Sequence, residues 1–171
     1  MTYSKLVVLF ALATQLVCAR AGDTGPVMAN LVGGWKLFSF SFQKEDGSVV
    51  LPFGENPVGI AIYDAKGNMS AQIMRADIPK FRSRERTGDP TDQEMRIAYE
   101  GYIGYGGKYD IDATNSTITF HVKVSSYPNW VGTDLTRSLE FAGDDRLTLR
   151  ARIPSMEGVP ATLIQIWHRM N

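Results

Sequence analysis

The chain has 171 residues, of which 44% are hydrophobic, and its 18 lysines and arginines balance 18 aspartates and glutamates. This length predicts a single domain with enough apolar side chains for a hydrophobic core. Because the net charge is close to zero, the composition argues against nucleic acid or an anionic membrane surface as the partner.

The first 21 residues have the pattern of a signal peptide. Lys5 precedes an apolar run at residues 6–17, and Ala19 and Ala21 are small residues at the two positions that a signal peptidase reads. The apolar run is about a dozen residues long, whereas a membrane span needs roughly 20. We therefore predict that residues 1–21 are cleaved and that the protein enters the secretory pathway or is secreted, without membrane contact afterwards. An uncleaved anchor is the alternative.

Cleavage would remove Cys18, which is the single cysteine of the sequence. The mature chain would then have no disulfide, no thiolate nucleophile and no cysteine ligand for a metal. Two sequons, Asn68-Met69-Ser70 and Asn115-Ser116-Thr117, predict N-glycosylation at Asn68 and Asn115, which agrees with a secretory route.

Alternation of apolar and polar residues predicts strands along most of the remaining chain. After a polar lead-in at residues 22–30, the predicted strands lie at residues 34–42, 58–63, 69–75, 103–111, 117–125, 133–141, 146–152 and 161–169. In the first strand Trp35 and Leu37 share one face while Phe38 and Phe40 share the other, so we expect both faces to be covered.

One helix is predicted at residues 92–100, between the third and fourth strands. Thr91 and Glu94 have the spacing of a capping box, and apolar residues recur behind them at helical spacing. The polar, basic residues 78–89 before the helix predict a solvated loop or lid, with an anion-binding loop as the alternative.

Together these elements predict an all-β fold, an eight-stranded up-and-down antiparallel barrel with one short helix. Closing eight strands into a barrel removes the exposed sheet edges and leaves room for one small ligand. No internal repeat or second domain is visible in the sequence.

Several short motifs, taken together and in order, resemble the lipocalin-like domain family. They are LVGGW at residues 31–35, PFG at 52–54 with PVG at 57–59, GNMSAQ at 67–72, GYIGYGGKY at 101–109 and PNWVGT at 128–133. The resemblance covers roughly residues 30 to 169, and we place the domain at 30–171.

The resemblance implies a small lipocalin-like β-barrel. Many members of the family have no assigned activity. Fungal members that resemble this chain occur beside secondary-metabolite pathways, where lipocalin-type barrels act as isomerases, cyclases or pericyclases. The family offers no catalytic motif that transfers residue by residue, and the predicted leader departs from its usual cytosolic members.

Motifs for metal, nucleotide and nucleophile chemistry are absent from the sequence. His121 and His168 lie on different predicted strands without an HExxH motif or a carboxylate cluster, which argues against a zinc site. The sequence also lacks a GxSxG elbow, a Walker loop and a dinucleotide fingerprint. We therefore predict a pocket that works without metal or cofactor.

The candidate catalytic residues are one histidine and two tyrosines. His121 has an ordinary pKa of about 6.5 and is suited to proton transfer near neutral pH. The alternative is an outward position, because Thr119 and Lys123 share its face of the strand. Tyr102 and Tyr105 are candidate phenol donors to a carbonyl or enolate, with core packing as the alternative.

The remaining candidates would bind the substrate through aromatic or polar contacts. Each has an ordinary structural alternative: core packing for the aromatic residues, a backbone hydrogen bond for the amides and a solvent-facing position for the arginine. The predicted substrate-binding residues are Trp35, Tyr63, Gln72, Asn129, Trp130, Arg137 and Trp167.

Two hypotheses of function follow from a barrel whose interior is apolar and holds few polar groups. The first is a cofactor-independent isomerase or cyclase, pericyclases included, that acts on an apolar polyketide- or terpenoid-like secondary metabolite held in the barrel. The alternative is a secreted carrier that binds a small apolar organic molecule without altering it. A protein-interaction or structural barrel with a packed interior is a third reading, and a homodimer is left open.

Overall fold

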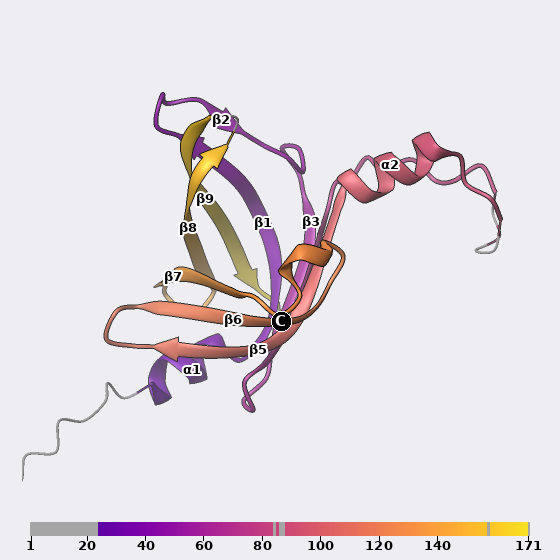
Figure 1. Cartoon of the computed structure of the whole chain (residues 1–171). Helices are drawn as coiled ribbons and strands as arrows, with labels where there is room; N and C mark the ends of the chain where they lie inside the picture. Colours follow the sequence, from indigo (N-terminus) through magenta and orange to yellow (C-terminus); the bar gives the residue numbers. More distant parts are fainter. Residues whose placement is uncertain (1–23, 84, 86–87, 157, 171) are drawn as a thin grey trace, which may run out of the picture.

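The computed structural model describes residues 24–83, 85, 88–156 and 158–170 (Figure 1). The predicted signal peptide, including Cys18, lies outside the described residues. Within the described part of the chain, no helix combines the length and the apolar character that crossing a membrane requires.

Eight long strands form a closed antiparallel barrel, which confirms the predicted fold. Each strand pairs with its neighbour in sequence, and the pairing of the first long strand with the last closes the sheet. The elements in chain order are α1 (Gly25–Leu31), β1 (Gly33–Lys44), β2 (Val49–Val50), β3 (Val58–Tyr63), β4 (Asn68–Met74), α2 (Asp92–Glu100), β5 (Tyr102–Asp112), β6 (Thr117–Ser125), the 3₁₀ turn η1 (Pro128–Trp130), β7 (Asp134–Ala142), β8 (Arg146–Met156) and β9 (Val159–Arg169).

The predicted helix is confirmed at the predicted residues as α2. Thr91 accepts a hydrogen bond from the Glu94 N–H, and the Glu94 carboxylate accepts one from the Thr91 N–H, which completes the capping box. The helix has no buried residue, and Figure 1 shows it extending away from the barrel. Local sequence signals therefore set this helix without help from the core.

A β-bulge in β1 changes which side chains of this strand face the core. The register of β1 against β9 shifts between Leu37 and Ser39, so one extra residue enters β1. Leu37 and Phe40 are consequently both buried, while Phe38 is 60% exposed and stacks on His168 outside. The prediction that both faces of this strand are covered is therefore wrong, because the bulge brings the apolar residues on either side of it to one face.

A second bulge lies where β5 crosses β6. The register shifts between Gly106 and Gly107, leaving Lys123 of β6 without a partner. Val122 is buried, whereas Val124, two residues further on, is 65% exposed. Phe120, Val122 and Val124 thus do not share one face, as strict alternation would require.

The helix α1, which falls in the predicted lead-in, packs against one end of the barrel. Leu31 is buried, and its carbonyl accepts a 2.8 Å hydrogen bond from the Trp35 indole N–H. The Arg169 guanidinium stacks on Trp35 at 4.4 Å from the ring and donates to the carbonyls of Asn30 and Val32. These contacts tie the start and the end of the barrel sheet together.

We predict that Gly107→Ala strongly destabilises the barrel. A Cβ at this position would lie 2.1 Å from the backbone oxygen of His121, and a backbone atom in a strand pair cannot move away without breaking the pair. The free energy of unfolding, measured by urea denaturation, should fall by roughly 1–3 kcal/mol or more.

Gly34→Ala is the matched control for that change. Its Cβ would meet its nearest neighbours at ordinary contact distances of 3.5 Å or more, so stability should stay within about 0.5 kcal/mol of the unmodified chain. Equal losses in the two variants would contradict the close backbone approach at Gly107.

Candidate functional site

A cavity of about 590 Å³ occupies the half of the barrel away from α1. Its walls come from β1, β4, β5, β7, β8 and β9, the end of α2, the segment at residues 126–130 and the loop that carries Phe53. This volume lies within the range of small-molecule sites, roughly 300–1,000 Å³. Among the described residues, the opposite half of the barrel is filled by buried side chains such as Trp35, Tyr63 and Trp167.

Aromatic rings form much of the cavity wall. Phe40 meets Phe53 edge to face with ring centroids 4.9 Å apart, and Tyr105 meets Trp130 in the same manner at 5.5 Å. Trp130 also contacts Tyr127 at 5.6 Å. Such edge-to-face walls suit a planar aromatic guest, whose own ring can extend the same pattern.

The predictions for Trp130, Tyr105 and Arg137 agree with the structure in position, because all three line the cavity. Pro128 begins the short turn η1, which brings Trp130 over the opening. Tyr105 is buried on β5, and Arg137 projects inward from β7 in step with Leu135 and Leu139.

Two buried polar side chains interrupt the apolar wall. Arg137 is 6% exposed and Gln165 is 1% exposed. Among the described residues, neither Arg137 Nε nor Gln165 Oε1 has a hydrogen-bond partner. The cavity therefore offers a buried cation and a buried amide on a mainly apolar wall, with Glu100, Asp134 and Arg152 also among its lining residues. A mainly apolar wall with a few placed polar groups is the pattern by which ligand pockets orient a guest.

Three of the predicted binding residues lie instead in the packed half of the barrel. Trp35, Tyr63 and Trp167 are buried in the core and are not among the residues that line the cavity, so the structure does not place them where they were expected. Tyr63 meets Tyr109 edge to face at 5.5 Å, and burial raises its pKa well above the usual value. Their alternative, core packing, is what the structure has.

Three further candidates direct their polar atoms to the outer surface. The Tyr102 hydroxyl lies over Gly104 and donates to Gln72 Oε1 at 3.4 Å, on the outer face of β4 and β5. Asn129 is exposed in η1, and its side-chain amide donates to the Tyr127 hydroxyl at 3.4 Å. Tyr102 still borders the cavity mouth, but its phenol is not aimed at a guest, and the predicted roles of these groups in the pocket are not supported.

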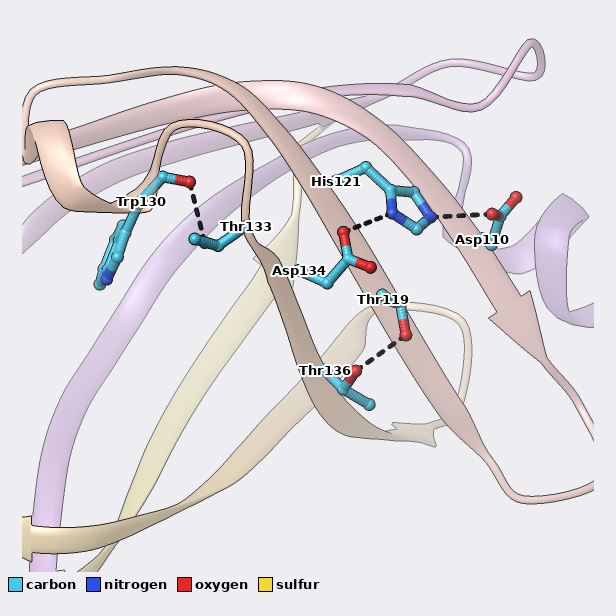
Figure 2. A network of polar contacts seen from close by, with 7 residues as sticks. All are labelled: Asp110, Thr119, His121, Trp130, Thr133, Asp134 and Thr136. Atoms are coloured by element: carbon cyan, nitrogen blue, oxygen red, sulfur yellow. Dashed lines mark hydrogen bonds and ion pairs between the residues drawn. The ribbon is translucent and has the colours of Figure 1, made fainter.

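His121 lies on the outer face of the barrel, between two carboxylates (Figure 2). Its Nδ1 is 2.7 Å from Asp134 Oδ1 on β7, and its Nε2 is 2.9 Å from Asp110 Oδ2 on β5. Two hydrogen bonds raise the pKa of His121 above its usual value, and the one to Asp134 has a larger effect than the one to Asp110. The prediction of a catalytic His121 in the pocket is wrong in position, and the imidazole instead links three adjacent strands.

Residues that the sequence reasoning missed complete the cavity. Phe53 comes from the loop before β3, and Gln165 comes from β9. The sequence could have indicated Gln165, because it lies between Leu163 and Trp167 on the inward face of its strand. A polar residue in the middle of an apolar face is the same signal that Arg137 carries on β7.

The predicted glycosylation sites, Asn68 and Asn115, are both exposed at hairpin turns. The Asn68 side-chain amide donates to Asp64 at 2.6 Å, and that of Asn115 donates to Asp112 at 2.7 Å. Within the described part of the chain, no group of three or more histidine, cysteine, aspartate or glutamate side chains is placed to hold a metal ion.

Comparison with known families accounts for this architecture. The model of the lipocalin-like domain matches residues 32–170. The chain belongs to the lipocalin-like domain family. The resemblance seen in the short motifs is thereby confirmed over nearly the whole of the described barrel.

Relatives of this lipocalin-like domain include one protein with a named ligand. The 4'-hydroxy-3'-methoxypropiophenone carrier protein ppsC of Aspergillus oryzae (strain ATCC 42149 / RIB 40) is 37% identical over 82 residues, which are 44% of this chain and 73% of that protein. Among solved structures, a redesigned β-barrel covers 84% of this chain and 95% of its own, with 12% identity and a TM-score of 0.42. A de novo designed fluorescence-activating β-barrel covers 84% and 97%, with 14% identity and a TM-score of 0.40.

We predict that His121 makes the stability of this lipocalin-like domain depend on pH. The folded-state pKa of His121 is raised, so its stabilising contribution is complete below the unfolded value of about 6.5 and is lost as pH rises through the folded value. The urea midpoint of the unmodified chain should therefore exceed that of His121→Gln most at pH 5.5, and the difference should shrink toward pH 9.

The measurement to follow is the difference in urea midpoint between the unmodified chain and His121→Gln at each pH, because other groups titrate equally in both. Thr119→Val, which breaks the neighbouring 3.0 Å hydrogen bond to Thr136, is a control that should shift the midpoint by the same amount at every pH. A difference for His121→Gln that grows with pH would contradict this sign.

Proposed function

We propose that this protein is a carrier that holds a small, mostly apolar aromatic molecule in the open half of its barrel. The observation that carries the proposal is the cavity of about 590 Å³, walled by aromatic rings and holding two buried polar side chains. A barrel that served only as a structural or interaction module would have no need of a hollow interior.

The composition of the wall supports an aromatic guest in particular. The ring pairs Phe40 with Phe53 and Tyr105 with Trp130 both belong to the lining of the cavity. The carrier from Aspergillus oryzae is named for a phenyl ketone that also bears a hydroxyl and a methoxy group. We therefore propose aryl ketones and compounds of similar size as the ligand class.

A second candidate function is the isomerisation or cyclisation of a polyketide- or terpenoid-like metabolite. It is favoured by the presence of a phenol, Tyr105, and a cation, Arg137, in the same cavity wall. A phenol can donate a proton or a hydrogen bond to a carbonyl, and a buried cation can stabilise an enolate. His121 has no part in this candidate, because it lies outside.

Secretion of this protein is predicted from the signal-peptide pattern at residues 1–21. Secretion is supported by the two sequons, which stand at exposed turns where a glycan would not meet the barrel. Expression in a secreting eukaryotic host, followed by mass measurement before and after glycan removal, tests both the cleavage and the modification of Asn68 and Asn115.

The binding proposal is tested with 4'-hydroxy-3'-methoxypropiophenone as the probe, followed by quenching of tryptophan fluorescence. Trp130 lines the cavity, so its emission should change when the probe enters. Ala151→Phe places a ring into the same space and should weaken binding at least tenfold, since Ala151 also lines the cavity. His121→Ala, on the outer face, is the matched control and should bind as the unmodified chain does.

The fate of the ligand separates the two candidate functions. A carrier returns the probe unchanged after incubation, and Tyr105→Phe binds it with similar affinity. An isomerase or cyclase alters its substrate, and Tyr105→Phe then lowers turnover more than binding. Failure of Ala151→Phe to weaken binding would place the ligand outside the barrel and remove the carrier proposal.

A further inference from the structure

The buried guanidinium of Arg137 is the least expected group in the cavity. It extends from the inward face of β7, where its neighbours on that face are Leu135 and Leu139. Arginine stays protonated at any physiological pH, so this side chain brings a permanent positive charge into an apolar interior.

No described residue forms an ion pair with this charge, although Glu100 and Asp134 also line the cavity. None of the ion pairs within the described part of the chain includes Arg137, and Nε has no hydrogen-bond partner there. Asp134 lies on the same strand, but its carboxylate is bonded to His121 on the outer face. The contact of Arg137 with a ring is to Phe120, at 5.8 Å from the ring centroid.

Gln165 places a second unpaired polar group in the cavity. It lies on β9, where Leu163 and Trp167 flank it on the inward face, and its Oε1 has no partner among the described residues. A side-chain amide can both donate and accept hydrogen bonds. A ligand oxygen held by Arg137 and a hydroxyl offered to Gln165 would satisfy the two buried atoms of the cavity that lack partners.

A buried cation without a partner binds an anionic oxygen better than a neutral one. Burying an unpaired cation is costly, and a ligand that supplies the opposite charge recovers that cost. Charge-assisted hydrogen bonds from arginine to an oxyanion are also stronger than those between neutral groups. An uncharged carbonyl oxygen gains less, and a hydrocarbon gains nothing from this part of the cavity.

We infer that Arg137 and Gln165 form an oxygen-recognition end of the cavity, which selects aromatic ligands that carry an acidic oxygen. The preferred class comprises carboxylates, phenolates and enolates on an apolar ring system, with neutral ketones second. This inference rests on the proposed function, since it assumes that the cavity takes an aromatic guest at all.

The test uses three naphthalenes of nearly equal size that differ in one substituent. 2-Naphthoate carries an anion, 2-acetylnaphthalene carries a neutral carbonyl, and 2-ethylnaphthalene carries no acceptor. Titration calorimetry of the full chain at pH 7.5 should rank their affinities in that order, with at least tenfold between the first and the last.

Two arginine variants then test whether Arg137 causes the preference for 2-naphthoate. Arg137→Met should weaken 2-naphthoate binding at least tenfold while leaving 2-ethylnaphthalene within about threefold, because only the charge interaction is removed. Arg150→Met is the matched control, since Arg150 lies on the outer face and is bonded to Glu140 at 2.5 Å. It should bind all three probes as the unmodified chain does.

The outcomes separate this inference from the proposal on which it rests. Equal binding of the three naphthalenes, or an equal loss for all of them in Arg137→Met, overturns the oxygen-recognition end and leaves the carrier proposal in place. Binding of none of them overturns the oxygen-recognition end, and the carrier proposal is then decided by the titration with 4'-hydroxy-3'-methoxypropiophenone. If Arg137→Met fails to fold, the ranking in the unmodified chain still decides, and Gln165→Met supplies a second variant, expected to weaken 2-naphthoate more than 2-ethylnaphthalene.

Discussion

The hydrogen-bonded pairing of β1 with β9 is the constraint on which the rest of the molecule depends. It joins the first and last long strands, so that no long strand is left with an unpaired edge. Eight strands enclose an interior that side chains can fill or that one small molecule can occupy. This protein does both, in different halves of the same barrel.

The division between a packed half and a hollow half follows from the distribution of large side chains. Trp35 and Trp167 fill the end that α1 and Arg169 close, and their contacts make this end a rigid base. At the other end aromatic side chains such as Phe40, Tyr105 and Trp130, together with the small Ala151, line the cavity. The two halves are not independent, because Phe40, Phe53 and Tyr105 belong to the hydrophobic core and also line the cavity.

Charge is divided between the two surfaces of the sheet in a similar way. On the outside, His121 is satisfied by Asp110 and Asp134, so its charge is useful for holding strands together. On the inside, Arg137 lacks such partners among the described residues. A group that is fully satisfied within the fold contributes to stability, whereas an unsatisfied one has interaction energy left for a ligand.

The sequence by itself determined the number and order of the long strands, the capped helix α2 and the family, because alternation, turn residues and capping are local signals. Of the residues that it named as candidates, Tyr105, Trp130 and Arg137 line the cavity. Only the tertiary structure decided that His121, Gln72 and the Tyr102 phenol face outward, and that Trp35, Tyr63 and Trp167 belong to the packed half. The physical reason is that alternation shows which residues of a strand share a face, but not which face turns inward or which half of the barrel stays hollow. Those depend on contacts between strands far apart in the chain, as does the position of each bulge.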